Sequence, residues 1–256
     1  MALPGLNGKV AVVAGGATGI GAATARRLAA EGCSVVIGDI NEDGAKRTSQ
    51  EISASGGVAT AVWFDLAEAD SIAELTRTTV TEFGGVDLLF NVGSDMSLLP
   101  GDTDAVDIDL AVWERTMTVT LRGYLLIMQQ VIPNLLARGG GAIVNMSSAA
   151  AFQGEPTRPA YATAKAGVCA LTRHVASRWG RDGIRCNAVA PGLTATVAIR
   201  SAPQWPDLQA AALKRMRSAR VGEPDDIAAM VAFLMSDDGA WINGQTINID
   251  GGTILR

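Results

Sequence analysis

The 256-residue chain has few of the residues that build disulfide frameworks or metal centres. Its three cysteines, Cys33, Cys169 and Cys186, are odd in number and widely spaced, and it has a single histidine, His174. Cysteines in this pattern are typical of small buried apolar residues in a reducing compartment. We therefore expect a cytoplasmic protein without disulfides or a metal site, in which His174 has a packing or surface role.

Long apolar runs and an excess of positive charge are also missing. The longest charge-free stretches, Val10–Ala25 and Gly139–Gly154, are broken by polar residues or glycine and are shorter than a membrane span. The start, Met1–Lys9, lacks the basic and apolar regions of a secretory signal. The formal net charge of −5 gives no electrostatic reason to bind nucleic acid or an anionic membrane. We expect neither as a partner.

The chain does have short runs rich in Val and Ile that alternate with longer segments of helical period. The predicted strands are Lys9–Ala14, Ser34–Asp39, Val58–Phe64, Leu88–Asn91, Ala142–Ser147, Arg185–Ala190 and Gln245–Ile249. The predicted helices are Gly19–Glu31, Glu42–Ser55, Asp70–Phe83, Leu110–Arg138, Tyr161–Trp179 and Pro224–Met235. Such alternation implies buried parallel strands joined by crossover helices. We predict a single doubly wound α/β domain of the Rossmann type over residues 1–256, with its ligand at the carboxyl ends of the strands.

Two stretches depart from this alternation. The stretch Ser94–Asp109 carries five aspartates, whose spacing matches no metal-binding loop. We interpret it as a solvated loop before a helix, with a carboxylate metal site as the alternative. Residues 193–221 follow a strand end and hold Trp205 between two prolines, so this segment is a candidate lid over the substrate site.

A glycine-rich turn joins the first predicted strand to the first predicted helix. Gly15 permits a tight turn, and the bare backbone at Gly19 and Gly21 lets a pyrophosphate approach the helix N-terminus, where unpaired N–H groups favour anions. Asp39 ends the second strand twenty residues after Gly19, where a carboxylate can accept hydrogen bonds from a ribose diol. The alternative is an ordinary turn with an ordinary Asp, but the strand–turn–helix context favours dinucleotide binding.

Asp39 also indicates which dinucleotide binds. A carboxylate there would repel a 2′-phosphate, and no Arg or Lys lies in the glycine turn or directly after Asp39 to receive one. The sequence therefore favours NAD(H) over NADP(H).

Tyr161 and Lys165 stand four residues apart on one face of a predicted helix. A free tyrosine is a poor acid–base group, and lowering its pKa by about three units takes about 4 kcal/mol. A neighbouring ammonium and a positively charged nicotinamide ring can supply much of this. A buried strand that ends in two serines, the second being Ser148, comes thirteen residues before Tyr161.

With these features the chain closely resembles the short-chain dehydrogenase/reductase family over essentially its whole length. The matching motifs are the TGxxxGxG-like turn, Asp65-Leu66, Ser148, Tyr161-xxx-Lys165, Arg185–Gly192 and Ile249–Gly252. The resemblance implies a sheet of about seven parallel strands with helices on both faces. It implies Tyr161 as general acid/base, Lys165 as the group that binds the nicotinamide ribose and lowers the tyrosine pKa, and Ser148 as a hydrogen-bond partner of the substrate oxygen.

The resemblance also implies where the cofactor binds. Asp65 and Leu66 are expected near the adenine, and Thr194 and Thr196 near the carboxamide and phosphate of the nicotinamide half. The expected cofactor-binding residues are Gly15, Thr18, Gly19, Ile20, Gly21, Asp39, Ile40, Asp65, Leu66, Asn91, Val92, Gly93, Tyr161, Lys165, Pro191, Gly192, Thr194 and Thr196.

Three positions depart from the family pattern. Ala14 replaces the first Thr of the glycine motif, which removes one hydrogen bond. The usual Asn-Asn-Ala-Gly is Asn91-Val-Gly-Ser94 here. Thr120 stands where the family has an Asn that helps to hold a water in a proton relay to the lysine. As the catalytic candidate at this position, Thr120 can hold a water through its hydroxyl, with a shorter reach and a different geometry.

The predicted helix Leu110–Arg138 is apolar over a wider arc than one buried face requires. One side can cover the sheet and the other can meet a partner, so we expect a homo-oligomer. In the resembled family this helix pairs across a two-fold axis, commonly within a tetramer, with a dimer as the alternative.

The expected activity is hydride transfer between NAD(H) and a secondary alcohol or ketone of small to medium size. Leu98, Phe152, Leu193 and Trp205, on the segments expected to wall the site, favour a largely apolar substrate. Two alternatives stay open: an NAD-binding regulatory or scaffold protein with little turnover, and a reductase of 3-oxoacyl thioesters.

Overall fold

The computed structural model describes residues 2–255, in which seven strands form one parallel sheet in the order β3-β2-β1-β4-β5-β6-β7. The strands are β1 (Val10–Ala14), β2 (Ser34–Asp39), β3 (Val58–Trp63), β4 (Leu88–Asn91), β5 (Gly141–Met146), β6 (Ile184–Pro191) and β7 (Thr246–Ile249). Each coincides with a predicted strand to within one residue at either end. The strand order reverses beside β1, which pairs with both β2 and β4, and a crevice opens at such a point in doubly wound folds.

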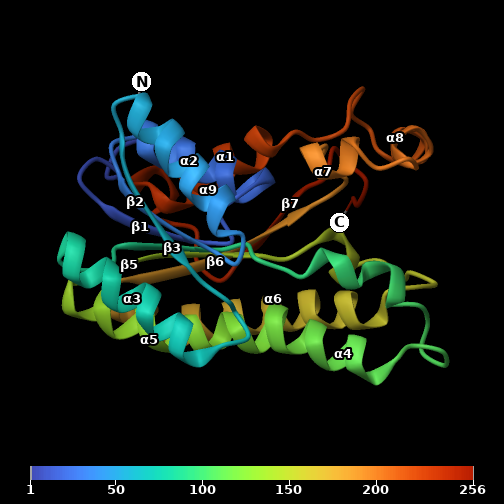
Figure 1. Ribbon diagram of the computed structural model, residues 1–256, viewed down its shortest axis with the longest axis horizontal. Helices are drawn as coiled ribbons and strands as arrows, with labels where there is room; N and C mark the ends of the chain where they lie inside the picture. The colour runs from blue at the N-terminus through green and yellow to red at the C-terminus, as the bar shows by residue number, and fades with distance from the viewer. Residues whose placement is uncertain (1, 256) are drawn as a thin grey trace.

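Helices cover both faces of the sheet (Figure 1). One face carries α1 (Gly19–Ala30), α2 (Glu42–Ala54) and α9 (Pro224–Met235). The other carries α3 (Ala69–Phe83), α4 (Leu110–Thr116), α5 (Gly123–Ala137) and α6 (Pro159–Trp179). Successive strand residues face opposite sides, so Val13 belongs to the core under α1 and α9 whereas Val12 belongs to the core under α5 and α6.

The predicted helix Leu110–Arg138 is not α-helical throughout. A π-helical segment, η2 (Met117–Arg122), joins α4 to α5 without a break in the path of the chain. Apolar spacing does not distinguish a π turn from an α turn over so few residues, so the sequence could not reveal it. Thr120 lies in this segment, and π turns inside α-helices are frequent at functional sites.

The segment 193–221 contains two helices that the sequence analysis missed, α7 (Val197–Arg200) and α8 (Trp205–Arg215). The two ends of the segment are held together, because Ala195 N donates to Gly222 O at 2.7 Å and Gly222 N donates to Leu193 O at 3.1 Å. Within it, the buried residues Ala195, Met216 and Val221 form a small core of their own. The remaining short helices are η1 (Met96–Gly101), η3 (Ala149–Ala151), η4 (Gly180–Asp182) and η5 (Asp237–Gly239).

The three cysteines are buried and free. Over residues 2–255, no helix is long and apolar enough to cross a membrane. No group of three or more His, Cys, Asp or Glu side chains in the same range is placed to hold a metal ion.

Candidate active site

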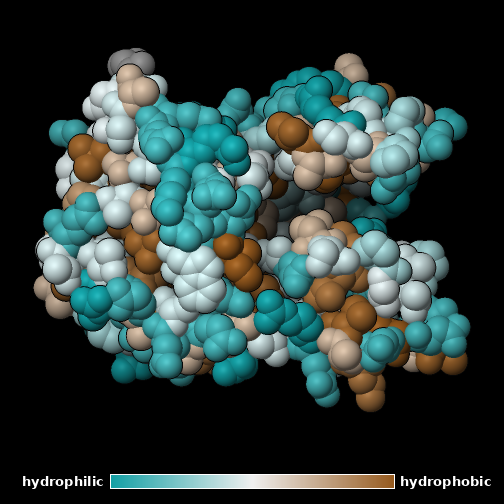
Figure 2. All heavy atoms as spheres, in the orientation of Figure 1, coloured by the Kyte–Doolittle hydropathy of each residue, from teal (hydrophilic) through white to brown (hydrophobic). Residues whose placement is uncertain are grey.

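The predicted site residues gather at the carboxyl ends of the strands. The space-filling view shows the molecule hollowed there, between the α7–α8 segment above and the region around α4 below (Figure 2). The segments that follow β1, β4, β5 and β6 all begin at this edge, because parallel strands end on the same side of a sheet.

The glycine turn after β1 is packed too closely for side chains. Gly15 has φ +105°, and a Cβ on it would lie 2.5 Å from the backbone nitrogen of Gly93. A Cβ on Gly21 would lie 1.9 Å from the carbonyl oxygen of Gly15. Gly19 has φ +55°, in the left-handed region that favours glycine. The three glycines therefore let the backbone make a turn that residues with side chains could not make.

The turn leaves the N-terminus of α1 open. Thr18, the N-cap residue, makes no side-chain capping hydrogen bond, and the first turn of α1 carries no acidic residue. The first N–H groups of a helix lack intrahelical partners and attract anions. An uncapped N-terminus beside bare glycine backbone fits a dinucleotide pyrophosphate, with Ile20 following directly in the first turn.

Asp39 lies beside the glycine turn, at the end of β2. Its Oδ2 accepts a hydrogen bond from Ala17 N at 2.9 Å, and its Oδ1 accepts one from Asn41 N at 2.9 Å. These bonds fix the carboxylate at the rim of the crevice, next to the exposed side chain of Ile40.

Asp65 and Leu66 come directly after β3 and lie close to the crevice. Asp65 Oδ1 accepts from Ala67 N at 2.8 Å, and its Oδ2 lies 3.7 Å from the guanidinium of Arg115. A Cβ on Gly93 would lie 2.7 Å from a methyl carbon of Leu66, so Leu66 packs against the segment after β4.

The segment after β4 presents its backbone, and not the Asn91 side chain, to the glycine turn. Asn91 is fully buried, and its Nδ2 donates to Asn145 Oδ1 at 2.8 Å inside the sheet. Val92 N and Gly93 N both donate to Ala14 O, at 3.0 and 2.8 Å, which holds this segment against the glycine turn. A direct contact of the Asn91 side chain with a nucleotide does not fit this arrangement.

The segment after β6 faces the glycine turn from the other side. Gly192 N, directly after Pro191, donates to Ile249 O at 3.1 Å, and Thr194 Oγ1 donates to Gly192 O at 3.2 Å. A Cβ on Gly19 would lie 3.1 Å from Thr196 Cγ2, so Thr196 is opposite the turn. The hydroxyl of Thr196 caps α7 by accepting from Ile199 N at 3.3 Å.

Tyr161 and Lys165 project from the first turns of α6. Lys165 is 1% exposed; its Nζ donates to Met146 O at 2.9 Å and to Ser94 Oγ at 3.0 Å. The same nitrogen lies 5.7 Å from the centre of the Tyr161 ring. The helix thus places a half-buried phenol beside a buried amine, as the spacing predicted.

The protonation of this pair is governed by burial. Burial raises the pKa of Tyr161, while a hydrogen bond with the Ser148 side chain and the charge of Arg158 act in the opposite direction. Burial also lowers the pKa of the Lys165 ammonium to about 7. The lowering of the tyrosine pKa expected from the Lys165 ammonium together with the positively charged nicotinamide ring stays a prediction.

Ser148 follows β5 and stands at the start of η3. Its Oγ accepts from Ala150 N at 3.2 Å, and the residue is half-buried at the cleft. The preceding Ser147 is buried, and its Oγ donates to Lys165 O at 3.0 Å. One serine therefore faces the cleft while the other ties β5 to the helix that carries the tyrosine and the lysine.

Thr120, the residue in place of the family's Asn, is 1% exposed. Among the residues described, it is not a hydrogen-bond partner of Lys165 Nζ, whose acceptors come from Ser94 and Met146. Because the family's relay runs through a water, the role of Thr120 stays a prediction.

Asp102 belongs to the site although no sequence motif marks it. We interpreted Ser94–Asp109 as a solvated loop, but Asp102 is 2% exposed and its carboxylate accepts from Ala160 N at 3.1 Å and Tyr161 N at 2.8 Å. The residue before α6, Arg158, has φ +68°, and its N donates to Asp102 O at 2.9 Å. A cap supplied by a residue nearly sixty positions upstream leaves no local signal in the sequence.

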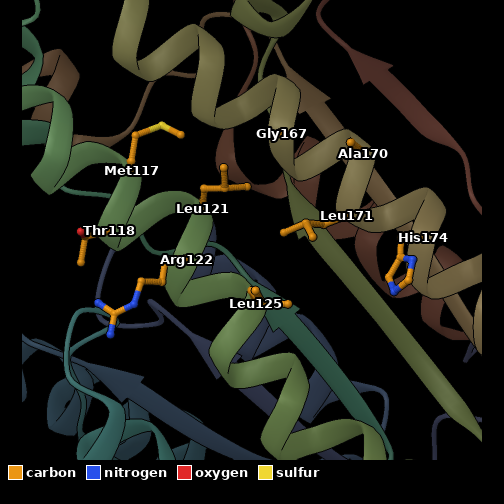
Figure 3. A pocket seen from close by; sticks show the side chains of 9 residues that line it. All are labelled: Met117, Thr118, Leu121, Arg122, Leu125, Gly167, Ala170, Leu171 and His174. Carbon is orange, nitrogen blue, oxygen red and sulfur yellow. The ribbon is translucent and has the colours of Figure 1, made fainter.

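An apolar groove lies away from this site. It has a volume of about 630 Å³ and runs between the η2–α5 segment and α6 (Figure 3). Leu121, Leu125 and Leu171 project into it from the two helices, with His174 at one end. His174 is exposed and makes an edge-to-face contact with Trp179, at 5.9 Å between ring centres.

Comparison with known proteins identifies the family. The short-chain dehydrogenase model described as "Enoyl-(Acyl carrier protein) reductase" matches residues 15–253. A probable short-chain type dehydrogenase/reductase from Bradyrhizobium diazoefficiens is 45% identical over 249 residues, which cover 97% of this chain and 88% of that protein. The 7α-hydroxysteroid dehydrogenase of Bacteroides fragilis is 37% identical over 249 residues, which cover 97% of this chain and 95% of that protein.

A solved structure superposes on nearly the whole chain. A 7α-hydroxysteroid dehydrogenase complexed with NADH and 7-oxo glycochenodeoxycholic acid matches with a TM-score of 0.91 and 31% identity, covering 98% of this chain and 96% of that one. The chain belongs to the short-chain dehydrogenase/reductase family. These comparisons confirm the expected family and the expected doubly wound fold. They also confirm the expected activity, that of an NAD(H)-dependent oxidoreductase acting on alcohol and ketone groups.

Proposed function

We propose that Tyr161, Lys165 and Ser148 transfer protons and position substrate while hydride passes between NAD(H) and a small to medium, largely apolar secondary alcohol or ketone. The observation that carries the proposal is the meeting of a buried amine, a phenol and a serine hydroxyl at one cleft, beside an uncapped helix N-terminus. When bound, the cofactor supplies the hydride chemistry.

The residues around the glycine turn would hold that cofactor. The backbone of Gly15, Thr18, Gly19, Ile20 and Gly21 would bind the pyrophosphate, and Asp39 with Ile40 would bind the adenosine ribose. Asp65 and Leu66 would flank the adenine, and Lys165 with Tyr161 the nicotinamide ribose. The other contributors would be the backbone of Asn91, Val92, Gly93, Pro191 and Gly192, together with Thr194 and Thr196.

In the oxidative direction, Tyr161 as phenolate accepts the substrate hydroxyl proton while Ser148 donates a hydrogen bond to the same oxygen. The carbonyl oxygen that forms stays hydrogen-bonded to the side chains of Tyr161 and Ser148. In the reductive direction Tyr161 returns the proton. Because burial raises the pKa of Tyr161, forming the phenolate depends on positive charge, which the oxidised nicotinamide ring supplies when bound.

Apolar side chains on both sides of the cleft support a largely apolar substrate. Met96 in η1, Val197 in α7, and Leu208 and Leu213 in α8 are all exposed. Exposed apolar groups on segments that flank a site are typical of apolar ligand pockets. The relative solved with an oxo bile acid is consistent with this chemistry.

We assign residues 193–221 as a lid within a single domain of residues 1–256. The segment packs on its own small core and is pinned at its base. Arg215 Nη2 donates to Gln153 Oε1 at 2.6 Å, which joins the lid to the segment after β5. A self-packed segment with a narrow base can move as a unit over a substrate.

We further propose a cytoplasmic homo-oligomer, a tetramer or a dimer. The apolar groove along η2, α5 and α6 supports pairing through these helices, and Leu125 within it is 40% exposed (Figure 3). Trp241 is 98% exposed, which favours a second covered surface near β7. The three free cysteines support a reducing compartment.

The test is NADH formation from a panel of secondary alcohols at mildly alkaline pH, for the parent protein and Tyr161→Phe. We expect turnover by the parent, a loss of about 10²- to 10⁴-fold in the variant because a general acid/base is removed, and NADH binding by both. Tight NADH binding without turnover by the parent would favour the regulatory or scaffold alternative. A strong NADPH preference with 3-oxoacyl thioesters would favour the thioester reductase.

A further inference from the structure

Lys165 contacts one hydroxyl to which the proposed mechanism assigns no role. Its Nζ donates to the carbonyl oxygen of Met146 and to the hydroxyl oxygen of Ser94, at 2.9 and 3.0 Å. A carbonyl oxygen accepts hydrogen bonds but has no hydrogen to pass on, whereas a serine hydroxyl both accepts and donates. Of the two contacts, Ser94 is therefore the one that can conduct a proton.

Lys165 is enclosed on the side of Tyr124. The amine is 1% exposed, and the fully buried ring of Tyr124 lies 5.4 Å from Nζ on one side. Burial raises the pKa of Tyr124 well above its usual range, so this phenol stays neutral at physiological pH. Ser94, by contrast, lies on the segment that leaves β4 for the cleft and is only half-buried. Its hydroxyl therefore joins the buried amine to a partly exposed residue, and Ser94 also shares a hydrogen bond with the Tyr124 phenol.

We propose that Ser94 conducts protons between Lys165 and solvent in this chain, where Thr120 replaces the family's relay Asn. The inference rests on the proposed roles of Tyr161 and Lys165. During alcohol oxidation the Lys165 ammonium gives a proton to Ser94 Oγ as the Ser94 hydroxyl gives its own hydrogen to a water molecule. The water becomes hydronium and Ser94 is unchanged. The neutral Lys165 amine then takes up the proton that Tyr161 accepted from the substrate, which returns both residues to their starting protonation states, and no electrons move in this step. Reduction runs the same step backwards.

Ser94 is a positioning residue in this scheme, because it acts through Lys165. Removing its hydroxyl should slow the return of Lys165 to its starting protonation state without disturbing the nucleotide site. We expect kcat of Ser94→Ala to fall at least about tenfold, less than the 10²- to 10⁴-fold expected for loss of the general acid/base itself. The solvent deuterium isotope effect on kcat should rise, and the dissociation constant for NADH, measured by fluorescence, should stay within about twofold.

Rescue by small proton carriers distinguishes proton conduction by Ser94 from a structural role, because a buffer molecule can carry a proton but cannot restore packing. We expect imidazole or ammonium buffer to restore much of the rate of Ser94→Ala and Ser94→Gly, and to have little effect on the parent. Ser94→Thr keeps a hydroxyl and should keep most of the activity. Ser97→Ala, which alters an exposed serine three positions along the same segment, is the matched control and should behave as the parent.

Unchanged kcat in both Ser94→Ala and Ser94→Gly would overturn the proposal. A loss of activity that neither buffer nor Ser94→Thr restores would also overturn it, because it would assign Ser94 a packing role. Failure of the proposed function itself gives a different result, since Tyr161→Phe would then turn over substrate like the parent.

Discussion

At the scale of single residues, burial decides the chemistry of the site. Tyr161 and Lys165 are recognisable from their spacing, but the spacing gives neither pKa. Burial brings the Lys165 pKa to about 7 and raises that of Tyr161. A lysine whose pKa is near 7 can exchange protons at physiological pH, whereas an exposed lysine stays charged. The buried position of α6 on the sheet therefore supplies what the two residue types alone do not.

Asp39 sets the cofactor preference. Asp39→Ser combined with Ile40→Arg removes a carboxylate that would repel a 2′-phosphate and adds a guanidinium that can pair with one. Since charge-assisted contacts contribute about 1.5–3 kcal/mol each, the ratio of kcat/KM for NADP to that for NAD should rise by about 10²-fold or more. Steady-state kinetics with both cofactors measure it. The single change Ile40→Ala is the control, and an unmoved ratio in the double variant would mean that Asp39 does not contact the ribose.

At the scale of elements, remote contacts hold the start of α6 in place. The helix begins at Pro159 after a residue with positive φ, and no side chain caps it locally. The Asp102 carboxylate binds the N–H groups of Ala160 and Tyr161 instead. Because the reacting phenol belongs to this first turn, the loop after β4 controls both the stability of the helix and the position of Tyr161.

Asp102→Ala leaves two buried N–H groups without an acceptor, and Asp102→Asn leaves one. We expect a loss of about 1–3 kcal/mol in unfolding free energy for the alanine variant and a smaller loss for asparagine. Kcat should fall more than KM rises, since Tyr161 is displaced from its reacting position. Urea unfolding and steady-state kinetics measure the two effects. Asp107→Ala, an exposed aspartate of the same loop, is the control, and equal behaviour of Asp102→Ala and Asp107→Ala would contradict this role.

The elements differ in how well the sequence predicts them. Strands such as Ser34–Asp39 are continuously apolar and bounded by turns, so pattern alone places them. The glycine turn and the Tyr161–Lys165 pair are local motifs and were found in the same way. Helix α8 was missed because Pro203 and Pro206 favour a loop, and none of the residues of the helix is buried. Asp102 and Ser94 were missed because their partners lie about 60 and 71 positions away.

At the scale of the whole molecule, an ion pair between the buried Asp87 and the exposed Arg138, at the amino ends of the strands, holds the sheet to its helices. Asp87 accepts from Val10 N at 2.8 Å and from Arg138 Nε and Nη2 at 2.7 and 3.0 Å. Burial raises the pKa of Asp87, but these hydrogen bonds and the charge of Arg138 together lower it by more. The net pKa of Asp87 therefore lies below its usual range. The carboxylate therefore joins β1, the segment before β4 and the end of α5.

The sign of the Asp87 pKa shift predicts how stability responds to acid. A lowered pKa in the folded state contributes stability that is present above the unfolded pKa of about 3.9 and is lost as pH falls through the folded pKa. Asp87→Asn should cost about 2–3 kcal/mol at pH 7, and the difference from the parent should shrink below about pH 4. Urea unfolding from pH 3 to 7 tests this. A difference that stays constant over this range would contradict it.

Assembly is the other property of the whole molecule. If the groove along η2, α5 and α6 is covered by a second copy, charges placed in it should separate the subunits. We expect Leu125→Glu with Leu171→Glu to lower the molar mass measured by light scattering from that of an oligomer toward that of a 26.4 kDa monomer. Val106→Glu, at an exposed apolar residue outside the groove, should leave the mass unchanged. An intact oligomer in the double variant would place the interface elsewhere.

The most direct measurement is a crystal structure of this protein with NADH bound. The account predicts the pyrophosphate at the N-terminus of α1 and the nicotinamide ribose within hydrogen-bond distance, about 3 Å, of Lys165 Nζ. It also predicts the phenol of Tyr161 beside the reacting face of the nicotinamide ring. A nicotinamide ring bound away from α6, or a Tyr161 hydroxyl turned away from it, would contradict the central claim.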